Sequence, residues 1–241
     1  MHSTAIIQKT PRHYVPANFL ITNWESLQTY FEELNNRPLS SLAELEKWLR
    51  DISEIQAVIS EDACWRQIKM TCDTENQALE DAFTFFCTEI EPHIKPYADA
   101  LNKKLVASPF LHELDQQLYF TYLRGVQKEI RLFNEKNIPL QAELSVLAQQ
   151  YGSITGKMSV EVEGKEYTLQ QAAKFLMLSN RAKRQEVYTK IGDRRCKDEH
   201  ELNLLFDQLL QKRHEVAVNA GFANYRDYKF EELGRFDYTV E

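Results

Sequence analysis

Residues 157–169 read Lys157-Met-Ser-Val-Glu-Val-Glu-Gly-Lys-Glu-Tyr-Thr-Leu169. In the first half of this stretch apolar residues alternate with polar ones, at Met158, Val160 and Val162. A period of two is typical of a β-strand. Glu163-Gly164 stands where a tight turn would reverse the chain, so we predict a β-hairpin near residues 157–168. A lone two-stranded ribbon is marginal in water, and we expect this one to pack against other elements.

Elsewhere the apolar residues recur at intervals of three and four, which is the period of an amphipathic helix. The chain has 241 residues but only 7 Gly and 7 Pro, about half the usual share. Since β-rich folds need many turns built from these residues, an all-β fold is excluded. We predict a mainly α fold, with layers of an antiparallel multi-helix bundle and the single hairpin.

Three helix starts carry a capping-box pattern, in which a Ser or Thr is followed three residues later by Glu or Gln. These are Thr22 with Glu25, Ser41 with Glu44, and Thr168 with Gln171. Further starts are expected near Glu75, Tyr97, Pro109, Pro139, Arg181, Asp198 and Asn224. A break is expected near Ser60, and Pro92 and Pro96 should kink or end the helix that precedes them. Gly221 should stop the helix before it.

Composition and charge exclude several protein classes. The 29 basic and 36 acidic residues give a net charge of −7, which disfavours binding to nucleic acid. No apolar run reaches the roughly 20 residues of a membrane helix, and the first residues lack the apolar core of a signal peptide. The cysteines show no C-x-x-C spacing, so we expect buried, reduced thiols and a cytoplasmic protein, at Cys64, Cys72, Cys87 and Cys196.

Motifs that would carry catalysis are missing from the sequence. No two histidines stand four residues apart and no H-E-x-x-H is present, so we predict surface histidines and no metal ligands, at His2, His13, His93, His112, His200 and His214. There is no G-x-S-x-G elbow and no phosphate-binding loop. Adjacent carboxylates, at Glu32-Glu33, Glu61-Asp62 and Glu80-Asp81, are expected on solvated helix faces. We therefore assign no catalytic residue, and substrate-contacting residues stay unassigned.

One segment is strongly basic. Residues 181–197 hold seven basic and two acidic side chains, whereas residues 25–91 hold 15 acidic and five basic ones. The basic helix could pair with the acidic region or line a cleft that takes substrates with carboxylates. The aromatic residues between 222 and 238 are expected to pack in a core, with a binding surface as the alternative.

The C-terminal third resembles a known family. Asn219-Ala-Gly-Phe-Ala-Asn-Tyr-Arg-Asp-Tyr-Lys-Phe230, followed by Leu233-Gly-Arg-Phe-Asp-Tyr-Thr239, is similar to oligoendopeptidase F-type members of the thimet oligopeptidase family. The hairpin stretch and Asn180-Arg-Ala-Lys-Arg-Gln-Glu-Val-Tyr188 follow the same order. The likeness is specific over the last 60 or so residues and loose over the first 100.

The resemblance implies a zinc metallopeptidase that cuts short peptides in a deep channel. It implies an N-terminal helical region at 1–107, the remainder of the family's N-terminal domain at 108–180, and the start of a catalytic domain at 181–241. The family's zinc ligands and catalytic glutamate lie on an H-E-x-x-H helix and a later glutamate, which are absent here. The chain stops in mid-pattern, so we expect an incomplete half of a larger helical peptidase fold.

Two functions follow as hypotheses. In the first, the chain is the N-terminal fragment of a zinc oligopeptidase, forms one wall of the channel, and binds no zinc and cuts no peptide alone. The hairpin near Gly164 and the basic helix from Arg181 would approach that channel. In the second, it is a helical protein-interaction module without enzymatic activity. In either case, helices that lack their packing partner would expose apolar surface and favour self-association.

Overall fold

The computed structural model describes residues 11–240, and within them the chain is helical apart from one hairpin. The α-helices are α1 (Glu25–Asn36), α2 (Leu42–Cys72), α3 (Gln77–Phe85), α4 (Glu91–Val106), α5 (Gln116–Leu132), α6 (Asn137–Gly156), α7 (Leu169–Ala172), α8 (Arg181–Lys197), α9 (Glu199–Asn219) and α10 (Tyr225–Glu232). The mainly α prediction is confirmed. The described chain divides into two compact units, residues 11–65 with 93–130 and residues 66–92 with 131–240.

The first unit is built around α1, most of α2 and α4. Apolar residues of α2 at three- and four-residue spacing form a buried stripe, at Leu45, Trp48, Leu49, Ile52 and Ile55. Leu27, Phe31 and Leu34 of α1 and Leu101 and Leu105 of α4 are buried as well. The core therefore consists of helix faces whose apolar spacing is visible in the sequence.

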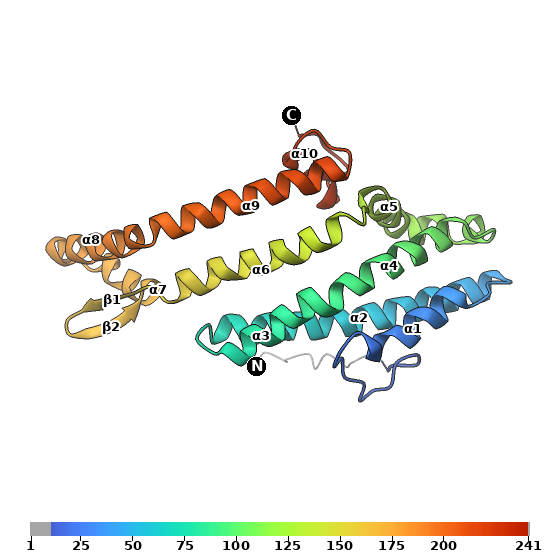
Figure 1. Cartoon of the computed structure of the whole chain (residues 1–241), viewed down its shortest axis with the longest axis horizontal. Helices are drawn as coiled ribbons and strands as arrows, with labels where there is room; N and C mark the ends of the chain where they lie inside the picture. The colour runs from blue at the N-terminus through green and yellow to red at the C-terminus, as the bar shows by residue number, and fades with distance from the viewer. Residues whose placement is uncertain (1–10, 241) are drawn as a thin grey trace, which may run out of the picture. The chain divides into compact units, whose positions relative to one another are not determined.

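In the second unit α6 and α9 pack along each other, with α8 and the hairpin at one end and α10 at the other (Figure 1). The strands β1 (Ser159–Val162) and β2 (Lys165–Thr168) pair antiparallel, with Val162 opposite Lys165. Glu163 and Gly164 between them have φ of 55° and 72°, as a type I′ turn requires. This confirms the predicted hairpin.

The apolar face of the hairpin packs against α7 and α8, as a marginally stable two-stranded ribbon requires. Met158, Val160 and Val162 form one buried cluster with Leu169, Ala172, Val187 and Ile191. Thr168 begins α7 with a complete capping box, in which its hydroxyl accepts from the Gln171 N–H and the Gln171 side chain accepts from the Thr168 N–H. This capping box is confirmed, and it joins the hairpin to the following helix.

One predicted interruption is absent, and another takes the form of a π turn. α2 runs without the break expected near Ser60. Pro92 and Pro96 do not end a helix, because residues 86–90 form a π-helical turn between α3 and α4. In a regular α-helix the Pro92 ring would meet the carbonyl four residues earlier, and Pro92 has no N–H to donate. The π turn just before Pro92 adds one residue to the hydrogen-bonded turn and so accommodates it. The separate helix predicted from Tyr97 does not form, because Tyr97 lies inside α4.

Two predicted helix starts are shifted. Asn23, not Thr22, caps α1, because its side-chain oxygen accepts the Ser26 N–H at 3.0 Å. The start expected at Pro109 produces only a 3₁₀ turn over residues 111–113, after which Leu114 is extended. α5 starts at Gln116, and the preceding Asp115 carboxylate accepts the N–H groups of Gln117 and Leu118. The predicted starts of α8 and α10 are confirmed, since Asn180 and Asn224 cap them.

Candidate functional site

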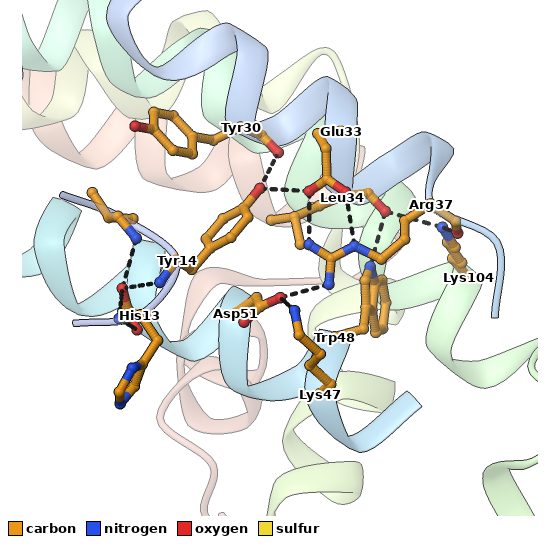
Figure 2. A network of polar contacts seen from close by, with 12 residues as sticks. His13, Tyr14, Tyr30, Glu33, Leu34, Arg37, Lys47, Trp48, Asp51 and Lys104 are labelled. Atoms are coloured by element: carbon orange, nitrogen blue, oxygen red, sulfur yellow. Dashed lines mark hydrogen bonds and ion pairs between the residues drawn. The ribbon is translucent and has the colours of Figure 1, made fainter. Parts of the chain in front are cut away.

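Figure 2 shows a polar network of the first unit that includes Tyr14, Arg37 and Lys104. Glu54 of α2, the residue before the buried Ile55, anchors one part of the same unit. Its carboxylate accepts backbone N–H groups from His13, Tyr14 and Val15 at 2.7–3.0 Å. Burial alone would raise the pKa of Glu54, but the three N–H donors outweigh it and lower this pKa. The carboxylate therefore holds the segment before α1 against α2.

Arg37, the residue after α1, connects α1 to α2. Its guanidinium makes two hydrogen bonds with Glu33, at 2.7 and 2.8 Å, and one with the buried Asp51 at 2.5 Å. Lys47 adds a second cation to Asp51 at 2.9 Å. Hydrogen bonding between Arg37 and Glu33 is the largest cause of both pKa shifts. It lowers the pKa of Glu33 and raises the pKa of Arg37. The bidentate pair fixes the orientation of Arg37.

Lys104 of α4 and Trp48 of α2 satisfy the carbonyl groups at the end of α1. The Trp48 indole donates to the Leu34 carbonyl at 2.9 Å, and the Lys104 ammonium donates to the carbonyls of Leu34, Asn35 and Arg37 at 2.6–3.0 Å. Burial, and then repulsion from Arg37, lowers the pKa of Lys104. A lysine at the negative end of the helix dipole stabilises the helix terminus.

Tyr14 completes the network. Its hydroxyl lies 2.9 Å from the Tyr30 carbonyl oxygen and 2.8 Å from a Glu33 carboxylate oxygen. Burial, followed by the bond to Glu33, raises the pKa of Tyr14. The hydroxyl therefore keeps its proton as a donor, and the acids around it are ionised and paired. These groups stabilise the unit and offer no activated nucleophile or base.

In the second unit the basic helix α8 lies against the hairpin. Lys183 pairs with Glu163 at 3.3 Å and with Glu186 at 3.1 Å, and Lys190 donates to the Glu161 carbonyl at 3.0 Å. Arg194 pairs with Asp198 at 2.5 Å. The ion pairs observed for this basic segment lie within its own unit, and one of them, Lys183–Glu163, joins it to the hairpin.

Two clefts open at this end of the unit. One of about 740 Å³ lies between α6, α7 and the end of α8, and Tyr151, Leu169 and Arg195 line it. The other, of about 370 Å³, is lined by Lys157, Arg194 and Glu201 among others. Both mix apolar and charged side chains. Neither brings together a nucleophile and a hydrogen-bonded base.

The predicted surface positions of the histidines are confirmed for five of them, which are exposed: His13, His93, His112, His200 and His214. His2 lies outside the described residues. Between residues 11 and 240 there is no group of three or more His, Cys, Asp or Glu side chains that could hold a metal ion. The side chains present therefore do not fit the zinc that the resemblance implies for a complete enzyme.

The cysteines are reduced thiols, as predicted, but three are not buried. Only Cys87 is buried, whereas Cys64, Cys72 and Cys196 are exposed. Cys72 is the last residue of α2 and Cys196 the second-last of α8, where side chains have less of the unit to pack against. Within the described part of the chain, no helix combines the length and apolar character that a bilayer crossing requires.

The sequence did not single out Glu54 or Lys104, although both support the first unit. A signal was present in α2, where Asp51 and Glu54 flank the apolar stripe three residues apart. Carboxylates beside a buried stripe need donors from another element. Which donors these are depends on contacts 39–41 residues apart for Glu54 and 67–70 residues apart for Lys104.

Comparison with known families and structures gives a consistent result. Residues 16–133 match the model of the peptidase M3 N-terminal domain. A protein described as an oligoendopeptidase F superposes with a TM-score of 0.86 at 26% identity, over 93% of this chain and 40% of its own. A similarly described protein from Bacillus anthracis str. Ames gives 0.85 at 21% identity, over 93% of this chain and 41% of its own. PZ peptidase A with an inhibitor gives 0.86 at 22% identity, over 92% and 40%.

This chain therefore spans about two fifths of the length of each of these structures. Their other three fifths have no counterpart in the 241 residues. No curated protein is a sequence match to the chain.

Proposed function

Because this chain is the N-terminal part of an M3-family oligoendopeptidase, we propose that it forms one wall of the substrate channel of a zinc oligopeptidase and is not catalytic alone. In the complete enzyme the substrates would be short peptides. The proposal rests on a match to the family's N-terminal domain in a chain whose described residues bring together no three His, Cys, Asp or Glu side chains that could hold a metal ion. Zinc, when bound in the complete enzyme, would activate the attacking water.

The role of this region would be to support and shape the wall of the substrate channel. The network around Glu54, Arg37 and Lys104 holds the first unit together without reactive groups. In the second unit the hairpin and α8 are joined by Lys183 and Lys190. A rigid wall limits which peptides reach a catalytic centre supplied by other residues. That the hairpin and α8 approach the channel stays a prediction, as does the division at residues 107 and 180.

Other parts of the proposal concern environment and partners. Reduced thiols at all four cysteines support a cytoplasmic location. The pairing of the basic segment with acids of its own unit supports the absence of a nucleic-acid partner. The competing proposal is a helical interaction module, and the exposed side chains of Phe206 and Leu210 favour it.

An assay with an internally quenched peptide separates the two proposals. The 241-residue chain and a version extended by the coding sequence downstream of Glu241 are each incubated with zinc. We expect hydrolysis by the extended protein and none by the short chain. Hydrolysis by the short chain would contradict a non-catalytic role, and an absence of any downstream peptidase sequence would favour the interaction module.

A further inference from the structure

The larger of the two clefts near the hairpin has a volume of about 740 Å³ and belongs to the second unit alone. Its lining residues come from the last turns of α6 and α8, from α7 and from the first turn of α9 (Figure 1). Protein cavities of about 300–1,000 Å³ hold small organic ligands. The cleft therefore has room for a molecule the size of one or two amino-acid residues.

Part of the lining is apolar and belongs to the core that packs the hairpin. Met158 and Leu169 line the cleft, and both are buried in the cluster that contains Val187 and Ile191. Leu202 of α9 also lines the cleft and is partly buried against this cluster. Because the surrounding core holds these side chains in place, the apolar part of the cleft exists before a ligand binds.

The lining also contains polar groups that lack a partner. Of the described residues that line the cleft, Arg195 alone carries a charge. Its guanidinium makes no hydrogen bond or ion pair with any residue from 11 to 240, and the Tyr151 hydroxyl makes none there either. The neighbouring Arg194, in contrast, pairs with Asp198 at 2.5 Å. A cation and a hydroxyl are thus free to bind a ligand beside an apolar surface.

Stabilisation of the helix terminus does not by itself account for Arg195. The last turn of α8 also carries Arg194 and Lys197, so two other cations are present for its carbonyl groups. Lys197 lines neither cleft, and Arg194 lines the smaller one, where Asp198 neutralises it. Arg195 differs from both because it is an unpaired cation in the lining of the apolar cleft.

We propose that this cleft binds a small ligand in which an apolar or aromatic body carries one carboxylate, and that Arg195 binds the carboxylate. A guanidinium presents two parallel N–H donors that match the two oxygens of a carboxylate. The apolar body covers Leu202 and Ala173 and removes them from water. The C-terminal residue of a peptide and a free carboxylic acid share this chemistry. The site goes beyond the proposed function, since it requires neither zinc nor the cleavage of a peptide bond.

A phosphate dianion fits the cleft less well than a carboxylate. α6 and α8 both end beside it, and the C-terminus of a helix carries partial negative charge. α9 begins there, but Glu199 and Glu201 in its first turn offset its positive end. One guanidinium balances one negative charge, whereas phosphate sites gather backbone N–H groups at a free helix N-terminus. The charges around the cleft therefore favour a monoanion.

The test is calorimetric titration of the 241-residue chain with three probes. These are N-acetyl-alanyl-phenylalanine, the C-terminal amide of the same dipeptide, and 3-phenylpropanoate. We expect an acid to bind and the amide to bind at least about tenfold more weakly, because the amide cannot form the charge-assisted hydrogen bonds to Arg195. Binding of both acids supports the shared chemistry, and binding of one acid alone supports it and identifies the source of the carboxylate.

Two variants locate the site. Arg195→Gln should weaken binding of the acid at least about tenfold, and Ala173→Leu should do the same by filling part of the cleft while Arg195 stays in place. The matched control is Lys197→Gln, which removes one positive charge from the same turn of α8 and leaves the cleft lining unchanged. It should bind like wild type. All three positions are exposed, so each Tm should stay within about 2 °C of wild type.

Three results would overturn the proposal. The first is that neither acid binds at concentrations up to about 10 mM. The second is that the amide binds as tightly as the acid. The third is that Arg195→Gln binds the acid like wild type or no more weakly than Lys197→Gln does. Because no probe is cleaved and no zinc is added, failure of the proposed function would leave this result unchanged.

Discussion

The ammonium group of Lys104 on α4 donates a 2.6 Å hydrogen bond to the carbonyl oxygen of Arg37, 67 residues away. Two more bonds reach the carbonyls of Leu34 and Asn35. One side chain thus satisfies three carbonyl groups at the end of α1 and joins α1 to α4. Several tests of the structure begin from contacts of this kind.

Lys104→Met should lower the free energy of unfolding by about 1–3 kcal/mol, because it leaves partly buried carbonyl groups without their charged donor. Urea denaturation at pH 7 measures the change. Lys47→Met is the matched control, since the Lys47 side chain is 65% exposed and its partner Asp51 keeps Arg37. It should cost about 0–1 kcal/mol. Equal losses for the two variants would refute the role given to Lys104.

Glu54 predicts a dependence of stability on pH. Its pKa in the folded state is below the ordinary value of 4.5, so the folded protein binds this proton less readily than the unfolded chain. The stabilisation is fully present above about pH 4.5 and is lost as the pH falls through the folded-state pKa. Glu54→Gln should therefore lose less stability than wild type between pH 6 and pH 3.

Urea midpoints at several pH values within that range measure the effect. The exposed Glu89→Gln variant serves as the control and should follow wild type. If Glu54→Gln and wild type showed the same decline, the N–H groups of residues 13–15 would not be what stabilises the Glu54 carboxylate.

The hairpin turn supplies a backbone prediction. Gly164 has φ of 72°, and an added Cβ would meet no atom within 4 Å. Gly164→Ala should therefore cost about 1–2 kcal/mol through backbone conformation alone. Gly192→Ala, inside α8 and also without close neighbours, should instead stabilise by about 0.5–1 kcal/mol. Thermal unfolding of the two variants should shift in opposite directions, and a shift in the same direction would argue against the type I′ turn.

Exposed apolar side chains predict weak self-association of the isolated chain. Phe206 and Leu210 of α9 are 57% and 53% exposed, and Leu118 and Phe120 of α5 are 74% and 56% exposed. Light scattering over a range of concentrations should show a rising average mass, and an apolar dye should bind. A strictly monomeric protein that binds no dye would contradict this expectation.

Much of the fold could be predicted from local patterns. The alternation at Met158, Val160 and Val162 and the turn at Glu163-Gly164 sufficed for the hairpin, because both signals act within a few residues. Asn224 and the Thr168 capping box marked helix starts for the same reason. The Ser41–Glu44 capping box was partly correct, since Ser41 accepts the Glu44 N–H at 3.3 Å, but the Glu44 carboxylate binds the N–H of Ser40.

The predictions were wrong where two local signals for a helix boundary competed, or where contacts between distant residues determined the partners of a side chain. Ser108-Pro109 is a valid helix start, yet Asp115 begins the longer helix. Proline at 92 usually breaks a helix, but a preceding π turn accommodated it. The partners of Glu54 and Lys104 depend on how separate helices pack, which local periodicity does not describe.

The sequence resemblance and the matching family model point to different parts of the chain. The likeness to oligoendopeptidase F-type sequences is specific over the last 60 or so residues, whereas the matching family model covers residues 16–133. For the candidate site the sequence predicted no metal ligands, and the side chains that stabilise the two units emerged only from the structure.

Titration of this chain with Zn²⁺ against a chromophoric chelator is the most direct test that it carries no peptidase metal centre. Structural zinc in zinc-finger peptides binds with about 10–16 kcal/mol, which corresponds to dissociation constants from tens of nanomolar down to picomolar. We predict no site tighter than about 1 µM. One equivalent of zinc bound at nanomolar affinity, and lost when side chains of residues 11–240 are substituted, would contradict the account.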